Sequence, residues 1–322
     1  MKLSTPISIP KSEVTIEHQT PSLFIGSCFA ENIGKKLIDN KFDVHLNPNG
    51  ILFNPISVAN SLRRIVKNQI YSLEDLREHQ GKWFSFEHHS RFSSFDPQEC
   101  LVQINNALTK AHEHLKKCTT IFITLGSAWV YEYEAVGIVA NCHKIPNNQF
   151  AKRLLTVQEI LVAFESIQED LKTYKIVFTV SPVRHTKDGL HENNLSKSTL
   201  LLAINNWVAQ HENASYFPAY EILIDELRDY RFYKADLVHP TDLAIEYVWE
   251  KFSNSYFKKP TQDLLAEIQQ LKSAANHQPY HFESEGHQRF IKKQLQLMAA
   301  LSKKHPFLEF QEEKYLLQKS SI

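Results

Sequence analysis

The chain has 322 residues, of which 43% are hydrophobic, and its 36 basic and 36 acidic residues leave a formal charge of zero. This length and apolar content suffice for a large buried core. The neutral balance, with only short basic clusters, argues against nucleic acid or an anionic membrane surface as a partner. We also expect no membrane span, because no apolar run approaches the roughly 18 to 20 residues that a membrane helix needs.

The cysteines and the N-terminal residues predict a cytoplasmic location. The four cysteines show no Cys-x-x-Cys spacing, which is typical of reduced thiols rather than of a structural zinc site. The first residues are not followed by the apolar segment of a signal peptide. We therefore expect a cytoplasmic protein that uses neither a metal nor another cofactor.

Short apolar runs alternate with helical patterns along most of the chain. The apolar runs end in glycine or Ser-Pro and predict buried strands at residues 23–25, 44–46, 119–125 and 174–180. Helical spacing covers residues 29–40, 55–67, 98–117, 157–173 and 193–210. This alternation predicts a parallel sheet covered by helices on both faces. Ligands of such sheets bind at the carboxyl ends of the strands.

Two stretches interrupt the alternation, and the end of the chain departs from it. Residues 83–90 indicate an extended segment, and residues 129–143 indicate a hairpin. Helical periodicity then covers residues 261–275 and 286–302. We therefore predict an α/β domain over residues 1–260 and a helical C-terminal extension over residues 261–322.

Two segments carry side chains suited to nucleophilic catalysis. Ser27 and Cys28 follow the first predicted strand, where a bend into a helix can present a nucleophile. Asp236 and His239 precede a helix that we expect to begin at Pro240. Their spacing lets the carboxylate reach Nδ1 of the imidazole, which fixes the tautomer and leaves Nε2 as a base. The alternative is a capping aspartate beside a packed histidine.

Together these segments resemble the SGNH (GDSL-like) hydrolase superfamily. More closely, the chain resembles the GSCFA-domain family, whose motif stands here as Gly26, Ser27, Cys28, Phe29 and Ala30. The resemblance covers most of residues 20–260. It implies a flavodoxin-like three-layer α/β/α sandwich of SGNH type, acting on ester or similar acyl bonds. The implied substrate is a small-molecule or glycan-linked acyl ester.

The resemblance leaves the nucleophile open between two neighbours. An ungapped match places the superfamily nucleophile at Cys28, and a one-residue shift places it at Ser27. A thiol near a protonated histidine and a helix N-terminus has a lowered pKa and forms a competent thiolate. Ser27 would instead need His239 to remove its proton during attack. A further alternative is that Cys28 is only a small buried apolar residue.

The same resemblance implies donors for an oxyanion hole. Gly50 matches the glycine after the second strand, and Gly126 follows the third, but the asparagine expected after Gly126 is missing. Asn141 or His143 could replace it. Arg184, at the end of a predicted strand, could bind a carboxylate or sugar hydroxyls, with a loop salt bridge as the alternative.

Three functions therefore compete. The first is an acyl-transfer enzyme, either an esterase or an acyltransferase. The second is a catalytically degenerate module that binds a carbohydrate or another ligand, because fold alone confers no activity. The third is a metal-dependent hydrolase that uses His88 and His89, although His112 and His114 diverge on their predicted helix.

Overall fold

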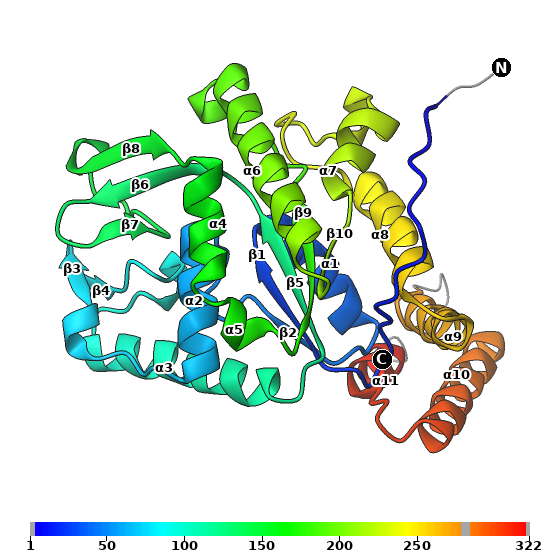
Figure 1. Ribbon diagram of the computed structural model, residues 1–322. Helices are drawn as coiled ribbons and strands as arrows, with labels where there is room; N and C mark the ends of the chain where they lie inside the picture. The colour runs from blue at the N-terminus through cyan, green and yellow to red at the C-terminus, as the bar shows by residue number, and fades with distance from the viewer. Residues whose placement is uncertain (1–3, 278–283, 320–322) are drawn as a thin grey trace.

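The centre of the molecule is a parallel sheet (Figure 1). The computed structural model describes residues 4–277 and 284–319. The sheet contains five strands in the order β10-β9-β5-β1-β2. Their bounds are β1 (Ser22–Gly26), β2 (Val44–Leu46), β5 (Thr120–Leu125), β9 (Lys175–Val180) and β10 (Ala214–Tyr216). The direction of the connections reverses between β1 and β5, so the edge beyond their carboxyl ends is the topological switch point of the sheet.

The two faces of the sheet are buried in separate cores because successive strand side chains point to opposite faces. Leu23 and Ile25 of β1 contribute to one core, and Phe24 contributes to the other. Helices of the first core are α2 (Pro55–Lys67), α3 (Pro97–Leu115), α4 (Val157–Glu165) and α6 (Leu190–Gln210). Helices of the second core are α1 (Cys28–Asp39) and α8 (Asp242–Tyr256). The predicted three-layer α/β/α sandwich is therefore confirmed.

Local sequence signals explain where several helices begin. Asn54 caps α2, accepting from Ser57 N at 2.8 Å, and Pro55 occupies the first turn. Thr156 and Glu159 form a capping box at the start of α4. The predicted helix over residues 157–173 is divided into α4 and α5. Shorter helical turns are α5 (Gln168–Leu171), α7 (Ala219–Glu221), the π-helix η5 (Ile222–Leu227), η1 (Leu73–Asp75), η2 (Ser90–Phe92), η3 (Asn147–Gln149), η4 (Thr186–Asp188) and η6 (Tyr230–Phe232).

Two small antiparallel sheets are inserted beside the main sheet, to the left in Figure 1. The predicted hairpin is confirmed as β6 (Trp129–Tyr133) and β7 (Gly137–Val139), with β8 (Phe150–Leu154) added on the other edge of β6. The other sheet pairs β3 (Arg77–His79) with β4 (Lys82–Phe84). Aromatic contacts among Phe84, Phe86 and Phe150 pack the two insertions together.

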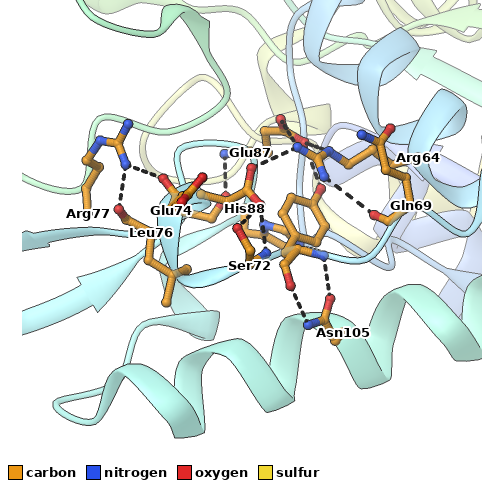
Figure 2. Close-up of polar contacts among 12 residues, drawn as sticks. Arg64, Gln69, Ser72, Glu74, Leu76, Arg77, Glu87, His88 and Asn105 are labelled. Atoms are coloured by element: carbon orange, nitrogen blue, oxygen red, sulfur yellow. Dashed lines mark hydrogen bonds and ion pairs between the residues drawn. The ribbon is translucent and has the colours of Figure 1, made fainter.

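A polar network around Arg64 attaches the segment that carries β3 and β4 to α2 (Figure 2). The guanidinium of Arg64 lies 3.0 Å from Glu87 and 3.1 Å from Asp75. It also lies 4.0 Å from the ring centre of Tyr71, whose hydroxyl donates to Glu87 at 2.7 Å. Asn105 of α3 accepts from the backbone N–H of Tyr71 and donates to its carbonyl. One arginine therefore holds two carboxylates from a segment that has little regular structure of its own.

Replacing Arg64 by methionine is expected to lower the free energy of unfolding by about 2 kcal/mol, because it leaves two partly buried carboxylates without their cation. Urea denaturation measures this change. The matched control is Lys67→Met, which removes a more exposed cation 3.4 Å from Asp170 and should cost no more than about 0.5 kcal/mol. Equal losses in the two variants would contradict the assigned role of Arg64.

The end of the chain adds a helical layer, at the lower right of Figure 1. Its helices are α9 (Lys259–Ala275), α10 (Glu285–Lys304) and α11 (Gln311–Lys319), which share a separate apolar cluster. The predicted C-terminal helices are therefore confirmed, and α11 is an addition to them. Lys41 forms a 2.8 Å ion pair with Glu313, whose side chain is 4% exposed, and so joins this layer to the sandwich. The domain division at residue 260 stays a prediction.

In the part of the chain that the structure describes, no helix has both the length and the apolar character required to cross a membrane.

Candidate active site

The turn after β1 lies at the switch point and requires a glycine. Gly26 has a φ of +134°, and a Cβ atom there would lie 2.1 Å from the carbonyl oxygen of Thr124 in β5. Its N–H donates to Oδ1 of Asn47 at 2.9 Å. The Nδ2 group of Asn47 in turn donates to Glu31 in α1 at 3.0 Å. The backbone of the turn is therefore fixed by both neighbouring strands before any ligand binds.

Ser27 is fully buried and has a structural role. It is the N-cap of α1, and its Oγ accepts a hydrogen bond from Phe29 N at 3.3 Å. Its own N–H donates to the carbonyl of Thr124 at 3.0 Å. These contacts hold the hydroxyl at the start of the helix, where it satisfies one of the free backbone donors.

Cys28 is the first residue of α1 and is partly exposed. Burial raises the pKa of its thiol above the ordinary value. The positive charge of Lys197 and the backbone N–H groups of Cys28 and Phe29 act in the opposite direction. The thiol is therefore protonated at rest, and its neighbours favour the thiolate once a base has removed the proton.

The predicted contact between Asp236 and His239 is present. Oδ2 of Asp236 lies 2.7 Å from Nδ1 of His239, and Oδ1 accepts from Val238 N and His239 N, both at 2.9 Å. The backbone hydrogen bonds from His239 and Val238, followed by the bond from the imidazole, lower the pKa of Asp236 to about 2. The carboxylate therefore stays ionised beside the imidazole, and Nε2 of His239 takes no part in this contact.

The loop that carries this pair differs in one detail from the prediction. The helix after it does not begin at Pro240, because Thr241 is the N-cap and α8 begins at Asp242. Pro240 instead pairs with Tyr233 in an isolated bridge. Within the loop, Leu237 has a φ of +57°, which is rare for a branched apolar residue and is found in constrained functional loops.

Helices α1 and α8 place the two segments at the same end of the molecule. Asn32 and Asp242 line one groove, and Lys36 and Glu246, each four residues further on, form an ion pair at 2.8 Å. The two helices therefore lie side by side. Val238, in the loop before α8, lines the same cleft as Arg184 and His185 after β9, so this loop lies at the carboxyl end of the sheet, where α1 begins.

A cleft of about 470 Å³ opens beside this end of the sheet. Val238 brings the loop of His239 to its wall, and Arg184 and His185 line it after β9. Its other lining residues include Phe53, Asn54, Ser127, Trp129, Tyr131, Asn141 and Cys142. Phe53 also packs against Gly126, which lies next to Ser27, so the wall of the cleft adjoins the turn after β1.

Comparison with known protein families identifies the chain. A model of the GSCFA family matches residues 21–252, which include both the turn after β1 and the loop of His239. The chain belongs to the GSCFA family. A second model, the C-terminal domain of GSCFA domain proteins, matches residues 268–321. No curated protein and no solved structure matches the chain.

The glycine amides predicted as oxyanion donors in this GSCFA chain are already engaged. Gly50 N donates to Asn47 O, and Gly126 N donates to Phe53 O, both at 2.8 Å. Gly50 has a φ of +80°, and a Cβ there would lie 2.3 Å from His89. Gly50 thus forms a tight turn that packs against the segment after β4. Neither amide can bind an oxyanion without giving up its present bond.

The two side chains proposed as a replacement donor lie in different environments. Burial lowers the pKa of His143 to about 4, its Nε2 lies 3.0 Å from Ser85 O, and its ring stacks on Phe84 at 4.1 Å. These contacts indicate a structural role. Asn141 accepts from His143 N through Oδ1 and lines the cleft. Its amide is the better placed of the two to meet a ligand.

Arg184 lines the cleft without an acidic partner among residues 4–277 and 284–319. Its Nε atom is buried and makes no hydrogen bond. A loop salt bridge, the alternative to substrate binding, is therefore not formed within the described residues. Asp188, an acidic residue that lines the same cleft, is paired with Lys152.

The candidate metal ligands of the GSCFA chain make structural contacts instead. His88 Nε2 lies 3.2 Å from Asn49 Nδ2, and burial lowers the pKa of His88 to about 3. His112 Nδ1 lies 2.8 Å from Ile65 O, and His114 Nε2 lies 3.2 Å from Ser22 O. Within the described ranges, no group of three or more His, Cys, Asp or Glu side chains is arranged to hold a metal ion.

Sequence reasoning missed Lys197, a buried lysine of α6 beside the turn. Its Nζ donates to Gly126 O and Ser181 O, each at 2.7 Å, and burial lowers its pKa to about 7. The available signal was its position on an apolar stripe: Lys197 shares the buried side of α6 with Leu200 and Ile204, which are three and seven residues after it. A lysine on such a face is unusual unless a polar group meets it.

Proposed function

We propose that this GSCFA protein is an acyl-transfer enzyme that acts on ester bonds, with Cys28 as nucleophile and His239 and Asp236 as its base and orienting carboxylate. The substrate class is a small-molecule or glycan-linked acyl ester. The observation that carries the proposal is the 2.7 Å contact between Asp236 and His239, in a loop whose Val238 lines the cleft at the carboxyl end of the sheet. The likeness of the turn after β1 to the SGNH nucleophile turn supports the same function.

Cys28 is favoured over Ser27 by exposure and hydrogen bonding. The Oγ of Ser27 is inaccessible and caps α1, whereas Cys28 is partly exposed at the first position of the helix. The raised pKa of the thiol argues that it needs a base, and Nε2 of His239 supplies one.

The proposed first half-reaction forms a thioester. Nε2 of His239 takes the proton of the Cys28 thiol, and the sulfur attacks the carbonyl carbon of the ester. Asp236 holds Nδ1 and stabilises the imidazolium that forms. The tetrahedral intermediate then expels the alkoxide, which takes the proton from Nε2 and leaves as an alcohol.

The second half-reaction releases the acyl group. His239 removes a proton from water or from an acceptor hydroxyl, whose oxygen attacks the thioester carbonyl. Collapse of this intermediate expels the thiolate, which recovers the proton from the imidazolium. Water gives an esterase and an acceptor hydroxyl gives an acyltransferase, so the same residues serve both outcomes.

The test is direct detection of the acyl-enzyme. The full chain would be mixed with aryl esters of acetyl to octanoyl length and quenched in acid after short times. Peptide mass spectrometry should find the acyl group on Cys28 at close to one equivalent, and not on Cys142, which is also partly exposed. The proposal fails if Cys28 remains unmodified throughout while the chain binds the esters, and a binding module would then be the better assignment.

Ser27 provides a separate prediction on stability. Removing its cap with Ser27→Ala should lower the free energy of unfolding by about 1 kcal/mol, and Ser27→Gly should cost only a few tenths of that. Both variants should keep ester turnover within a few-fold of wild type, measured beside chemical denaturation. Complete loss of turnover in both folded variants would instead make Ser27 the nucleophile.

A further inference from the structure

Lys197 is a cation buried without an anionic partner. Its side chain is 1% exposed, and within residues 4–277 and 284–319 it forms no salt bridge. Two carbonyl groups accept its hydrogen bonds, and the ring of Tyr220 lies 5.9 Å from Nζ. Burial of an ammonium group is costly unless it is compensated. Two neutral acceptors offset only part of that cost, which points to a use for the charge.

The two accepting carbonyls belong to the floor of the candidate site. Gly126 and Ser181 follow the carboxyl ends of β5 and β9 directly. Gly126 also packs on the turn after β1, since a Cβ there would lie 3.3 Å from Cβ of Ser27. Lys197 is thus one backbone group away from the residue that precedes Cys28.

The neighbouring residue of α6 binds the same segment. Oγ of Ser196 accepts from Ala128 N at 2.7 Å and lies 3.3 Å from Oγ of Ser127. Helix α6 therefore holds the segment after β5 with two consecutive side chains. One of them is neutral and the other is charged, which allows hydrogen bonding and charge to be tested separately.

Building on the proposed function, we infer that Lys197 is a positioning residue of the nucleophile turn whose ammonium group also stabilises negative charge on Cys28. Its two hydrogen bonds fix the ends of β5 and β9 beneath the turn. Its charge lies in the protein interior, where screening by water is weak. The thiolate and the oxyanion that follow from Cys28 are the negative charges formed nearest to it in the proposed reaction.

Electrostatics of both groups agree with this inference. Lys197 lowers the pKa of Cys28, and Cys28 acts to raise the pKa of Lys197, although burial has the larger effect on each. Other charged groups also act here. Glu31 on α1 raises the pKa of Cys28, while Arg184 lowers that of Lys197. His185 is affected by both Lys197 and His239, and burial lowers its pKa to about 4.

Alkylation of Cys28 by iodoacetamide as a function of pH tests the inference. The rate follows the thiolate fraction, and mass spectrometry of the Cys28 peptide separates it from the other cysteines. In Lys197→Met, which removes the amine, the rate at pH 6 should fall about tenfold. The two rates should converge as the pH rises well above 7, because burial lowers the pKa of Lys197 to about 7 and the wild-type amine then becomes neutral as well. In Lys197→Gln, which retains two N–H donors without the charge, the same fall at pH 6 is expected with a smaller loss of thermal stability.

Two controls distinguish charge from packing. Lys187→Met removes an exposed lysine from the wall of the cleft and should leave the rate at pH 6 unchanged. Ser196→Ala loosens the segment after β5 without changing any charge and should lower Tm while leaving the rate at pH 6 unchanged. A wild-type rate at pH 6 in folded Lys197→Gln, or an equal fall in Ser196→Ala, would overturn the inference.

Failure of this inference can be told apart from failure of the proposed function. Alkylation needs only the Cys28 thiol and no ester turnover, whereas acyl-enzyme formation needs the base and the substrate site. A lowered alkylation rate at pH 6 in the Lys197 variants, without acylation of wild type, would support the Lys197 inference and count against the esterase. Acylation with an unchanged alkylation rate would do the opposite.

Discussion

Replacing Cys28 by alanine is expected to reduce ester turnover by at least about 10³-fold, because it removes the sulfur that forms the proposed covalent intermediate. The residual rate would come from binding and backbone donors alone. Steady-state kinetics with aryl esters measure the loss as a change in kcat/KM. Thermal unfolding should stay close to wild type, since Cys28 lies at the partly exposed first position of α1.

The matched control is Cys142→Ala. Cys142 is also partly exposed and lines the cleft, but it follows β7 and lies outside the turn after β1. It should keep turnover within about threefold of wild type. Iodoacetamide should inactivate wild type and the Cys142 variant at similar rates. If Cys142→Ala alone removed activity, the nucleophile would have to be reassigned to the wall of the cleft.

His239→Ala is expected to reduce kcat by at least about 10³-fold, and Asp236→Asn by roughly 10² to 10⁴-fold. The histidine variant loses the base, whereas the asparagine variant keeps an acceptor at Nδ1 but loses the charge that stabilises the imidazolium. Because hydrogen bonds from His239 and Val238 lower the pKa of Asp236 to about 2, this carboxylate stays ionised down to that pH. Loss of activity between pH 4 and pH 7 should therefore not arise from Asp236.

Asp242→Asn is the control for these substitutions. Asp242 lies three residues after His239 in the sequence. Its side chain is 97% exposed, and its carboxylate lies 3.9 Å from Nζ of Lys234. Removing its charge should leave kcat within about twofold. Comparable losses in Asp236→Asn and Asp242→Asn would indicate a general effect of charge near α8 rather than an orienting role for Asp236.

Much of the fold was predictable because its signals are local. Apolar runs of strand length and the helical spacing between them indicated four of the five sheet strands and the helices of both faces. The fifth strand, β10, has only three residues of mixed character, so its own sequence carries little signal. Strand β8 was missed for another reason: its side chains are mostly polar or exposed, and its partner β6 identifies it as a strand.

The candidate site divides in a similar way. The contact between Asp236 and His239 spans three residues, so spacing alone was enough to predict it. The donors of the oxyanion hole were harder. Whether the amides of Gly50 and Gly126 are free depends on the carbonyls of Asn47 and Phe53, and the second of these bonds joins segments more than 70 residues apart in the chain.

The amino-acid sequence by itself determined the order of elements, the glycine turn after β1 and the Asp236 to His239 pair, because each follows from side-chain periodicity or from a contact across a few residues. Only the tertiary structure decided that Ser27 is fully buried, that the predicted glycine donors are engaged, and that Lys197 bonds the segments after β5 and β9. The physical reason is that a polar group is satisfied by whichever partner the packed chain brings to it. That partner often comes from a distant segment, where neither spacing nor composition records the contact.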